Sequence, residues 1–257
     1  MVLERQSVGP TRQAVIHDER ASLLREVSLF QGLDTKALTL IARMAHRRRV
    51  ERGAFFFLQG DAPLFLYLLT RGRVRLAQVT PEGYQVVFGF IGPRSVFGGI
   101  AVLGAAEYPV SAEAVEDCEA LAWDGETMTR LMEEYPQLAL NVIDLMARHV
   151  QELQDRLREL MTERVERRIA RTLLRLVRQT GRKVEAGILI DIPLTRQDLA
   201  EMTGTTLYTV SRILSRWESQ HLIKCGRAQV IIRKPHSLVV IAEDLPSDPP
   251  EERALAS

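Results

Sequence analysis

The residues best suited to specific chemistry lie in Leu194–Trp217, which reads L-T-R-Q-D-L-A-E-M-T-G-T-T-L-Y-T-V-S-R-I-L-S-R-W. Thr195 and Asp198 form a helix start signal, because the hydroxyl can cap free amide groups and the acid lies in the positive first turn. Gly204 suits the tight turn that sets a second helix at a steep angle to the first. The spacing therefore predicts two short helices joined by a sharp turn.

The predicted second helix, which Thr205 or Thr206 can cap, has two faces at helical spacing. One face is apolar and belongs to a core: Val210, Ile213, Leu214 and Trp217. The other face carries mostly small or hydrogen-bonding groups: Tyr208, Ser211, Arg212 and Ser215. Such a face can lie in the DNA major groove, where the Arg212 guanidinium matches the two acceptors of a guanine. The alternative is an ordinary helical hairpin whose solvent-exposed face is polar.

Further candidates for DNA contact flank these helices. Arg196 and Gln197 start the first helix, where phosphates can meet them, and two β segments, His221–Cys225 and Gln229–Arg233, resemble the wing of a winged helix. The wing offers three basic residues to the DNA backbone: Lys224, Arg227 and Arg233. The predicted DNA-binding residues are Thr195, Arg196, Gln197, Thr206, Tyr208, Ser211, Arg212, Arg216 and Lys224. For each basic residue taken singly, a solvated surface charge is the alternative.

Charge is distributed unevenly along the chain. The formal net charge is +1, but Glu163–Ile241 holds 15 Lys and Arg against 7 Asp and Glu, whereas the last sixteen residues hold 1 against 5. A basic segment inside a near-neutral chain is typical of a nucleic-acid-binding domain.

The elements before this segment change character twice. The first twenty residues lack periodicity and indicate an extension; a short helical stretch follows at Leu23–Val27, and Asp34 predicts the N-cap of a helix through Ala45. Glycines then punctuate Gly53–Gly92 at the turn spacing of an all-β sandwich or barrel. The predicted strands are Phe55–Leu58, Leu64–Leu69, Val74–Val79 and Val86–Ile91, with further extended segments in Val110–Trp123.

After Pro136, apolar residues step alternately by four and three, which predicts a coiled-coil seam rather than a drifting amphipathic stripe. The seam runs through Ala139, Ile143, Met146, Val150, Leu153, Leu157 and Leu160. The residues Glu152, Asp155, Arg156, Arg158 and Glu159 surround it and indicate a solvent-exposed helix. We therefore expect a homodimer through Ile143, Met146, Val150, Leu153, Leu157 and Leu160. The segment Val165–Gln179 predicts another helix, and Ile188–Ile192 a short strand.

Composition limits the other function classes. No apolar run approaches the ~20 residues of a membrane helix, and the N-terminus M-V-L-E-R-Q carries no secretory signal, so we expect a cytoplasmic protein without membrane contact. The two cysteines, Cys118 and Cys225, give no disulfide framework. No P-loop, G-x-S-x-G, H-E-x-x-H or paired acid/base motif occurs, so we expect no enzyme and no metal site.

These parts, in this order, resemble the Crp–Fnr family of bacterial transcription regulators over nearly the whole ordered length. The resemblance is carried by F-F-L-Q-G-D (Phe56–Asp61), R-G-R-V (Arg71–Val74), F-G-G (Phe97–Gly99) and L-T-R-Q-D-L-A…T-V-S-R-I-L. It implies an α+β fold: an N-terminal cupin-like β-roll sensor domain, a long dimerisation helix and a C-terminal winged helix-turn-helix. We assign 1–20 to a flexible extension, 21–135 to the β-roll sensor domain, 136–162 to the dimerisation helix, 163–241 to the DNA-binding domain and 242–257 to a disordered acidic tail. The implied partners are double-stranded DNA at palindromic sites, a second copy of the chain, and RNA polymerase.

The sequence departs from that pattern at the sensor site. Cyclic-AMP-binding members carry a glutamate after F-G and an Arg-Ser pair further on, where this chain has Gly99 and Y-P-V-S (Tyr108–Ser111). We therefore expect no cAMP binding, and the absence of an N-terminal cysteine cluster predicts no iron–sulfur cluster. The effector remains unknown; haem is one alternative, with His46, His149 and Cys118 as conceivable ligands. The candidate effector pocket comprises Phe97, Gly98, Gly99, Tyr108, Ser111 and His149.

In the reading helix, Tyr208 takes the place where many members have glutamate, while Ser211 and Arg212 remain. The sequence thus predicts an effector-gated transcription regulator. The alternative is a ligand-binding β-roll module that acts on a protein partner rather than on DNA.

Overall fold

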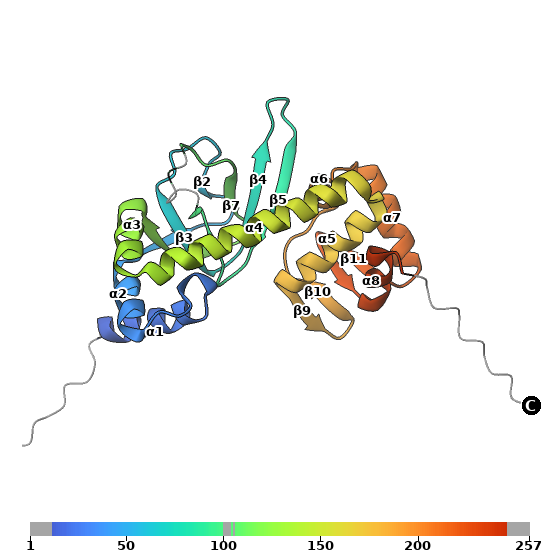
Figure 1. The fold of residues 1–257 in the computed structure, drawn as a ribbon. Coiled ribbons are helices and arrows are strands. Elements are labelled where there is room, and N and C mark those ends of the chain that lie inside the picture. Colours follow the sequence, from blue (N-terminus) through green and yellow to red (C-terminus); the bar gives the residue numbers. More distant parts are fainter. Residues whose placement is uncertain (1–11, 100–103, 105, 246–257) are drawn as a thin grey trace, which may run out of the picture. The chain divides into compact units, whose positions relative to one another are not determined.

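The computed structural model describes residues 12–99, 104 and 106–245, and these form two compact units (Figure 1). The first unit comprises the chain up to Leu76 together with Phe90–Gln151. The second comprises Ala77–Gly89 and the chain from Glu152 onward.

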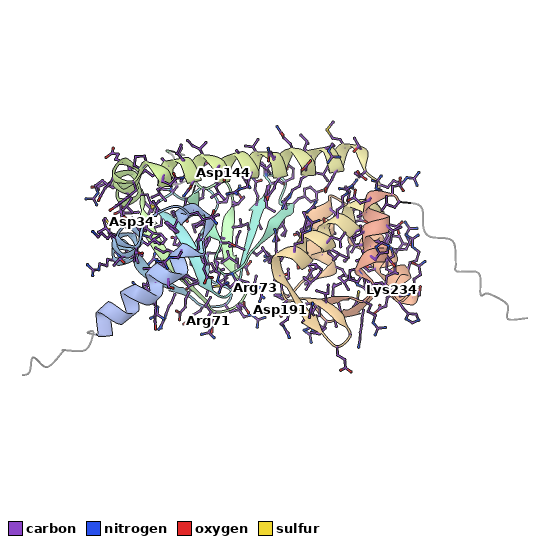
Figure 2. The ribbon with its side chains drawn as sticks, turned by 60° about the horizontal axis from the view of Figure 1, so that its bottom comes forward. Asp34, Arg71, Arg73, Asp144, Asp191 and Lys234 are labelled. Atoms are coloured by element: carbon purple, nitrogen blue, oxygen red, sulfur yellow. The ribbon has the colours of Figure 1, made fainter. Side chains whose placement is uncertain are left out.

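Helices open the first unit: α1 (Arg12–Arg25), the 3-10 turn η1 (Ser28–Phe30) and α2 (Thr35–Met44). The prediction for α2 is confirmed, because the Asp34 carboxylate (Figure 2) accepts a hydrogen bond of 2.8 Å from the Ala37 amide. The prediction of an extension through residue 20 is wrong from Arg12, where α1 begins. The run from Arg12 to Arg25 has no glycine or proline, and Leu24 is fully buried, yet no apolar stripe announces the helix.

The described residues that follow include eight strands, which form two four-stranded sheets. Their bounds are β1 (His46–Val50), β2 (Phe55–Phe57), β3 (Phe65–Arg71), β4 (Val74–Val79), β5 (Gln85–Ile91), β6 (Val96–Phe97), β7 (Ser111–Ala114) and β8 (Cys118–Asp124). The strand orders are β1-β8-β3-β6 and β2-β7-β4-β5. Strand β1, H-R-R-R-V, lacks apolar alternation and was not predicted; it exists because it pairs antiparallel with β8.

Alternation along β3 and β8 explains how the two sheets and the helices share a core. Leu66, Leu68, Leu121 and Trp123 face the helices, where the Trp123 indole donates to the Ile41 carbonyl at 2.9 Å. The residues between them face the second sheet and pack there with Phe57, Val74 and Ala112: Tyr67, Leu69, Ala120 and Ala122. This is the β-rich sensor fold that the sequence predicted.

Helix α3 (Gly125–Glu134), capped by Asp124, was not predicted, whereas the next helix was. Helix α4 (Pro136–Thr162) covers the segment predicted to carry the seam. Asp144, on α4 (Figure 2), pairs with Arg148 at 2.9 Å.

The second unit contains the remaining elements. They are α5 (Val165–Thr180), β9 (Gly181–Val184), β10 (Gly187–Ile190), α6 (Arg196–Thr203), α7 (Leu207–Ser219), β11 (Ile223–Gly226), β12 (Gln229–Ile232) and α8 (Pro235–Glu243), and the strand order is β11-β12-β10-β9. The core of this unit forms from the apolar faces of the helices: Ile169, Leu173, Leu199, Val210, Leu214, Trp217 and Leu238 are at most 1% exposed.

The prediction that an acidic tail begins at residue 242 is wrong at its start. Ala242 is fully buried within α8, which continues through Glu243; Pro235 at the first turn fixes a helical φ, and Leu238 anchors the helix. The tail residues 246–257 lie outside the described residues. Within the described ranges, no helix is both long and apolar enough to cross a membrane.

Candidate nucleic-acid interface

The first helix of the predicted pair is fixed by a reciprocal capping box. The Thr195 hydroxyl accepts from the Asp198 amide at 3.0 Å, and the Asp198 carboxylate accepts from the Thr195 amide at 2.8 Å. Asp198 is only 4% exposed, so this cap belongs to the core of the domain. It leaves Arg196 and Gln197 exposed at the positive end of α6, although the Gln197 amide also donates to Glu201 at 2.8 Å.

The turn between α6 and α7 is built as the sequence predicted. Gly204 adopts a left-handed conformation, with φ 59° and ψ 48°. The Arg168 guanidinium of α5, which the sequence analysis missed, donates to the carbonyls of Thr203 at 3.0 Å and Gly204 at 3.4 Å. Thr206 then caps α7, because its hydroxyl accepts from the Thr209 amide at 3.2 Å. Arg168 therefore ties the turn to α5.

The two faces of α7 separate as predicted. The apolar face is at most 5% exposed: Val210, Ile213, Leu214 and Trp217. On the opposite side Tyr208 is 77% exposed and Arg212 is exposed, while Ser211 is half-buried. Leu207, at the first position of the helix, is 47% exposed and adds an apolar group that the sequence analysis did not single out.

One predicted DNA-binding residue, Arg216, forms an ion pair inside the domain. Arg216 forms an ion pair with Glu166 of α5, and the same carboxylate accepts from the Trp217 indole at 2.9 Å. Glu166 was missed because it lies fifty residues away in sequence. Arg216 thus helps to position α7 on α5 through its ion pair with Glu166.

The wing is present and connected to both helices. Strands β11 and β12 pair from Ile223↔Ile232 to Gly226↔Gln229, which leaves Arg227 and Ala228 at the turn. The Ala228 carbonyl accepts from the Leu194 amide at 3.0 Å, so the wing tip lies beside the start of α6. Lys224 and Arg233 are exposed on the wing.

Some basic side chains of this unit are neutralised by ion pairs and others are not. Arg167, Arg171, Arg175, Arg182 and Arg216 all pair with carboxylates. Among the described residues, the following basic side chains of the helix pair and the wing form no ion pair: Arg196, Arg212, Lys224, Arg227 and Arg233. These five unpaired basic side chains lie on the elements predicted to meet DNA.

The predicted dimer seam is exposed in the single chain. Its side chains keep large exposed fractions: Ile143 63%, Val150 52%, Leu153 42%, Leu157 58% and Leu160 49%, while Met146 is half-buried. The expectation that Glu159 is solvent-exposed is wrong. Its side chain is buried and accepts two hydrogen bonds from Arg175, at 2.7 and 2.9 Å, because α5 folds back beside this end of α4.

The residues of the candidate effector pocket do not all meet. Phe97 and Tyr108 are buried in an aromatic cluster. The ring of Tyr108 stacks on that of Phe57 with 3.7 Å between the ring centroids, and the ring of Phe97 stacks on that of Tyr67 with 5.1 Å between the centroids. Gly98, with φ 71°, approaches the Phe65 carbonyl so closely that a Cβ there would lie 2.9 Å from the oxygen.

None of the other three members belongs to this cluster. Gly99 faces Leu66, the Ser111 hydroxyl accepts from the Gln59 amide at 2.9 Å, and His149 is exposed on α4. Burial raises the pKa of Tyr67 to about 12, which is typical of a phenol held in an apolar cluster.

The conceivable haem ligands do not fit such a group. The Cys118 thiol donates to the carbonyls of Arg73 and Glu116, both at 3.2 Å, and burial raises its pKa. The β1–β8 register places Cys118 opposite Val50 but His46 opposite Ala122, at the far end of the pair. In the part of the chain that the structure describes, no group of three His, Cys, Asp or Glu side chains is arranged to hold a metal.

Comparison with known proteins decides the family. The Crp-like helix-turn-helix domain matches residues 167–241, and the cyclic nucleotide-binding domain matches residues 47–135. The cyclic AMP receptor protein of Thermus thermophilus is 33% identical over 214 residues, which cover 83% of this chain and 96% of the relative. The chain belongs to the Crp–Fnr family of transcription regulators.

More distant relatives agree with this assignment. The transcriptional activator protein Anr of Pseudomonas aeruginosa is 26% identical over 76% of this chain and 80% of its own length. FixK2 from Bradyrhizobium japonicum has the same fold, with a TM-score of 0.68 at 22% identity over 77% of this chain and 96% of that protein. The protein is thus a DNA-binding transcription regulator with an N-terminal β-rich sensor domain and a C-terminal helix-turn-helix.

Proposed function

We propose that this family member binds palindromic DNA sites as a homodimer joined along α4. The exposed apolar seam supports the dimer, because a stripe with side chains from 42% to 63% exposed is costly to leave in water. A two-fold dimer presents two copies of α7, and a palindrome offers each copy the same half-site.

The observation that carries the proposal is the exposed face of α7, where Arg212 pairs with none of the carboxylates that the structure describes. Its guanidinium is free to pair with the two major-groove acceptors of a guanine, and Ser211 lies beside it. Tyr208 and Leu207 present apolar surface, which suits a thymine methyl. Thr206 lies at the same end of α7, with its hydroxyl occupied by the helix cap.

Phosphate contacts complete the proposed interface. The exposed side chains of Arg196 and Gln197 stand at the N-terminus of α6, where amide groups and the helix dipole favour an anion. Lys224 and Arg227 extend the basic surface along the wing, and Thr195 holds the end of α6 in place. Arg216 belongs to the support of α7 rather than to this set.

We further propose that the controlling signal is not cAMP. The position expected to accept ribose hydroxyls is Gly99, which has no side chain. The segment expected to supply a cation is Tyr108–Ser111, which holds no arginine, and the buried Tyr108 donates its hydroxyl to the Phe65 carbonyl at 2.9 Å. Without a cation a cyclic phosphate would be desolvated at a cost.

A cAMP-responsive regulator is the second candidate. It is favoured by the match to the cyclic nucleotide-binding domain and by two relatives named for cAMP, the receptor of Thermus thermophilus and a CRP-like cAMP-activated regulator of Mycobacterium tuberculosis that is 21% identical. Calorimetric titration of the full chain with cAMP separates the two. We expect no saturable heat; tight one-to-one binding would establish the second candidate.

The remaining parts of the proposal follow from DNA as the ligand. The dimer acts in the bacterial cytoplasm and recruits or blocks RNA polymerase, and it needs no catalytic step. Electrophoretic mobility shifts with a selected site test the core of the proposal: Arg212→Ala should lose discrimination at one base, and an unchanged preference would reject it.

A further inference from the structure

A cavity lies in the second unit between the C-terminal part of α4 and helix α5, and none of its lining residues belongs to the predicted DNA-reading face. Its volume is about 410 Å³, within the range of small-molecule sites. Five arginines contribute to its lining: Arg156, Arg158, Arg171, Arg175 and Arg178.

Three of these arginines are neutralised inside the protein. Arg158 pairs with Asp155 at 3.0 Å, Arg171 with Glu243 at 3.1 Å, and Arg175 with the buried Glu159 at 2.7 Å. These ion pairs consume three of the acidic side chains that line the cavity.

The other two guanidinium groups have no carboxylate within ion-pair distance among the described residues. Arg156 is half-buried and donates to the Phe88 carbonyl at 2.6 Å, while Arg178 is exposed at the cavity wall. Burial and the neighbouring Arg175 lower the pKa of Arg156 and outweigh the opposing effect of Glu152 and Glu159. An anion between Arg156 and Arg178 would relieve the cost of burying that charge.

We infer that this cavity binds a small ligand that carries a phosphate or pyrophosphate group, held by Arg156 and Arg178. Two N–H groups of a guanidinium can donate to two oxygens of one phosphate. Arg156 and Arg178 together carry two positive charges in this cavity, whereas the remaining acid, Glu152, carries one negative charge.

The cavity remains open in the proposed dimer. In the four–three repeat, Leu153 and Leu157 lie on the seam, whereas Glu152, Asp155 and Glu159 fall on the opposite face of α4. Since Arg168 of α5 holds the turn of the helix-turn-helix, a ligand that bridges α4 and α5 would change the free energy of DNA binding. The site is thus an effector site that shares no residue with the candidate effector pocket of the sensor domain.

Calorimetry with the full-length protein and inorganic pyrophosphate tests the inference without any DNA. We expect saturable binding with one ligand per chain, weakened about tenfold or more by Arg156→Gln and by Arg178→Gln, since each removes a charge-assisted contact. Arg130→Gln, an exposed arginine of α3 in the other unit, should change the dissociation constant less than about twofold.

Three outcomes would overturn the inference: no saturable heat at millimolar pyrophosphate, equal binding by Arg178→Gln and the wild type, or tighter binding of citrate than of pyrophosphate. Arg178 is exposed and forms no ion pair with any residue in the described ranges, so its variant should keep the circular dichroism spectrum of the wild type. Because the assay contains no DNA, its failure would leave the proposed DNA recognition intact.

Discussion

The exposed fractions of the seam side chains on α4 predict how much free energy the seam contributes to dimer formation. In the single chain Val150 is 52% and Leu157 is 58% exposed. Fully burying one such side chain contributes about 1.5–3 kcal/mol, so covering the exposed half contributes about 1 kcal/mol. Each residue occurs twice in a symmetric dimer, so replacing both by aspartate removes about 4 kcal/mol from association, before any repulsion between the new carboxylates.

A loss of about 4 kcal/mol raises the dissociation constant roughly a thousandfold. Analytical ultracentrifugation of V150D/L157D should therefore show a monomer at concentrations where the wild type is a dimer. Gln151→Asp places the same carboxylate on the exposed outer face of this helix and should leave the dimer intact. A monomeric wild type at micromolar concentration, or a double variant as dimeric as its control, would refute the seam.

Three further predictions concern the other parts of the chain. Asp198→Ala removes the carboxylate half of the α6 capping box, which accepts from the Thr195 amide, and should lower the free energy of unfolding by about 1–2 kcal/mol in thermal or urea melts, whereas Glu201→Ala on the same helix should be nearly neutral. Arg196→Ala should weaken binding to all DNA sequences about equally and reduce the slope of log affinity against log salt by about one in titrations at several salt concentrations; a loss confined to one site would contradict the phosphate contact. In the native protein Cys118 should react with iodoacetamide at neutral pH much more slowly than in the denatured chain. The reason is that burial raises the pKa of its thiol above the ordinary value, so the reactive thiolate forms only at higher pH. Equally fast labelling of the native and denatured protein would show that the thiol is accessible.

The sequence predicted best those elements whose ends are fixed by local chemistry. Asp34 caps α2, Thr195 and Asp198 form the capping box of α6, and Gly204 supplies the left-handed turn. In each case the interacting residues lie within a few positions of one another in the sequence. Such contacts leave a spacing that can be recognised in one sequence.

Elements that depend on distant partners were missed. Strand β1 forms on β8 across seventy residues of chain, and α8 is held by Leu238 and Ala242 against the core rather than by an apolar period of its own. Their local sequences, H-R-R-R-V and P-H-S-L-V-V-I-A-E, do not disclose those partners.

The candidate site shows the same division. Exposure of Tyr208 and Arg212 follows from the helical period of α7 and was predicted. The pairing of Arg216 with Glu166, the anchoring of the turn by Arg168 and the burial of Glu159 all join segments far apart in sequence. A basic residue's role depends on whether folding brings it a carboxylate, which a count of charges does not reveal.

The central claim is that the exposed face of α7 reads the DNA sequence, and binding-site selection from a random DNA library tests it most directly. Wild type, Arg212→Ala and Tyr208→Glu should be selected in parallel. Arg212→Ala should lose one guanine preference per half-site at a cost of roughly 1–3 kcal/mol. Tyr208→Glu should change the preferred base at one neighbouring position, because a carboxylate accepts from a cytosine amino group whereas the phenol packs on a thymine methyl. Identical preferred sites for all three proteins would contradict the claim.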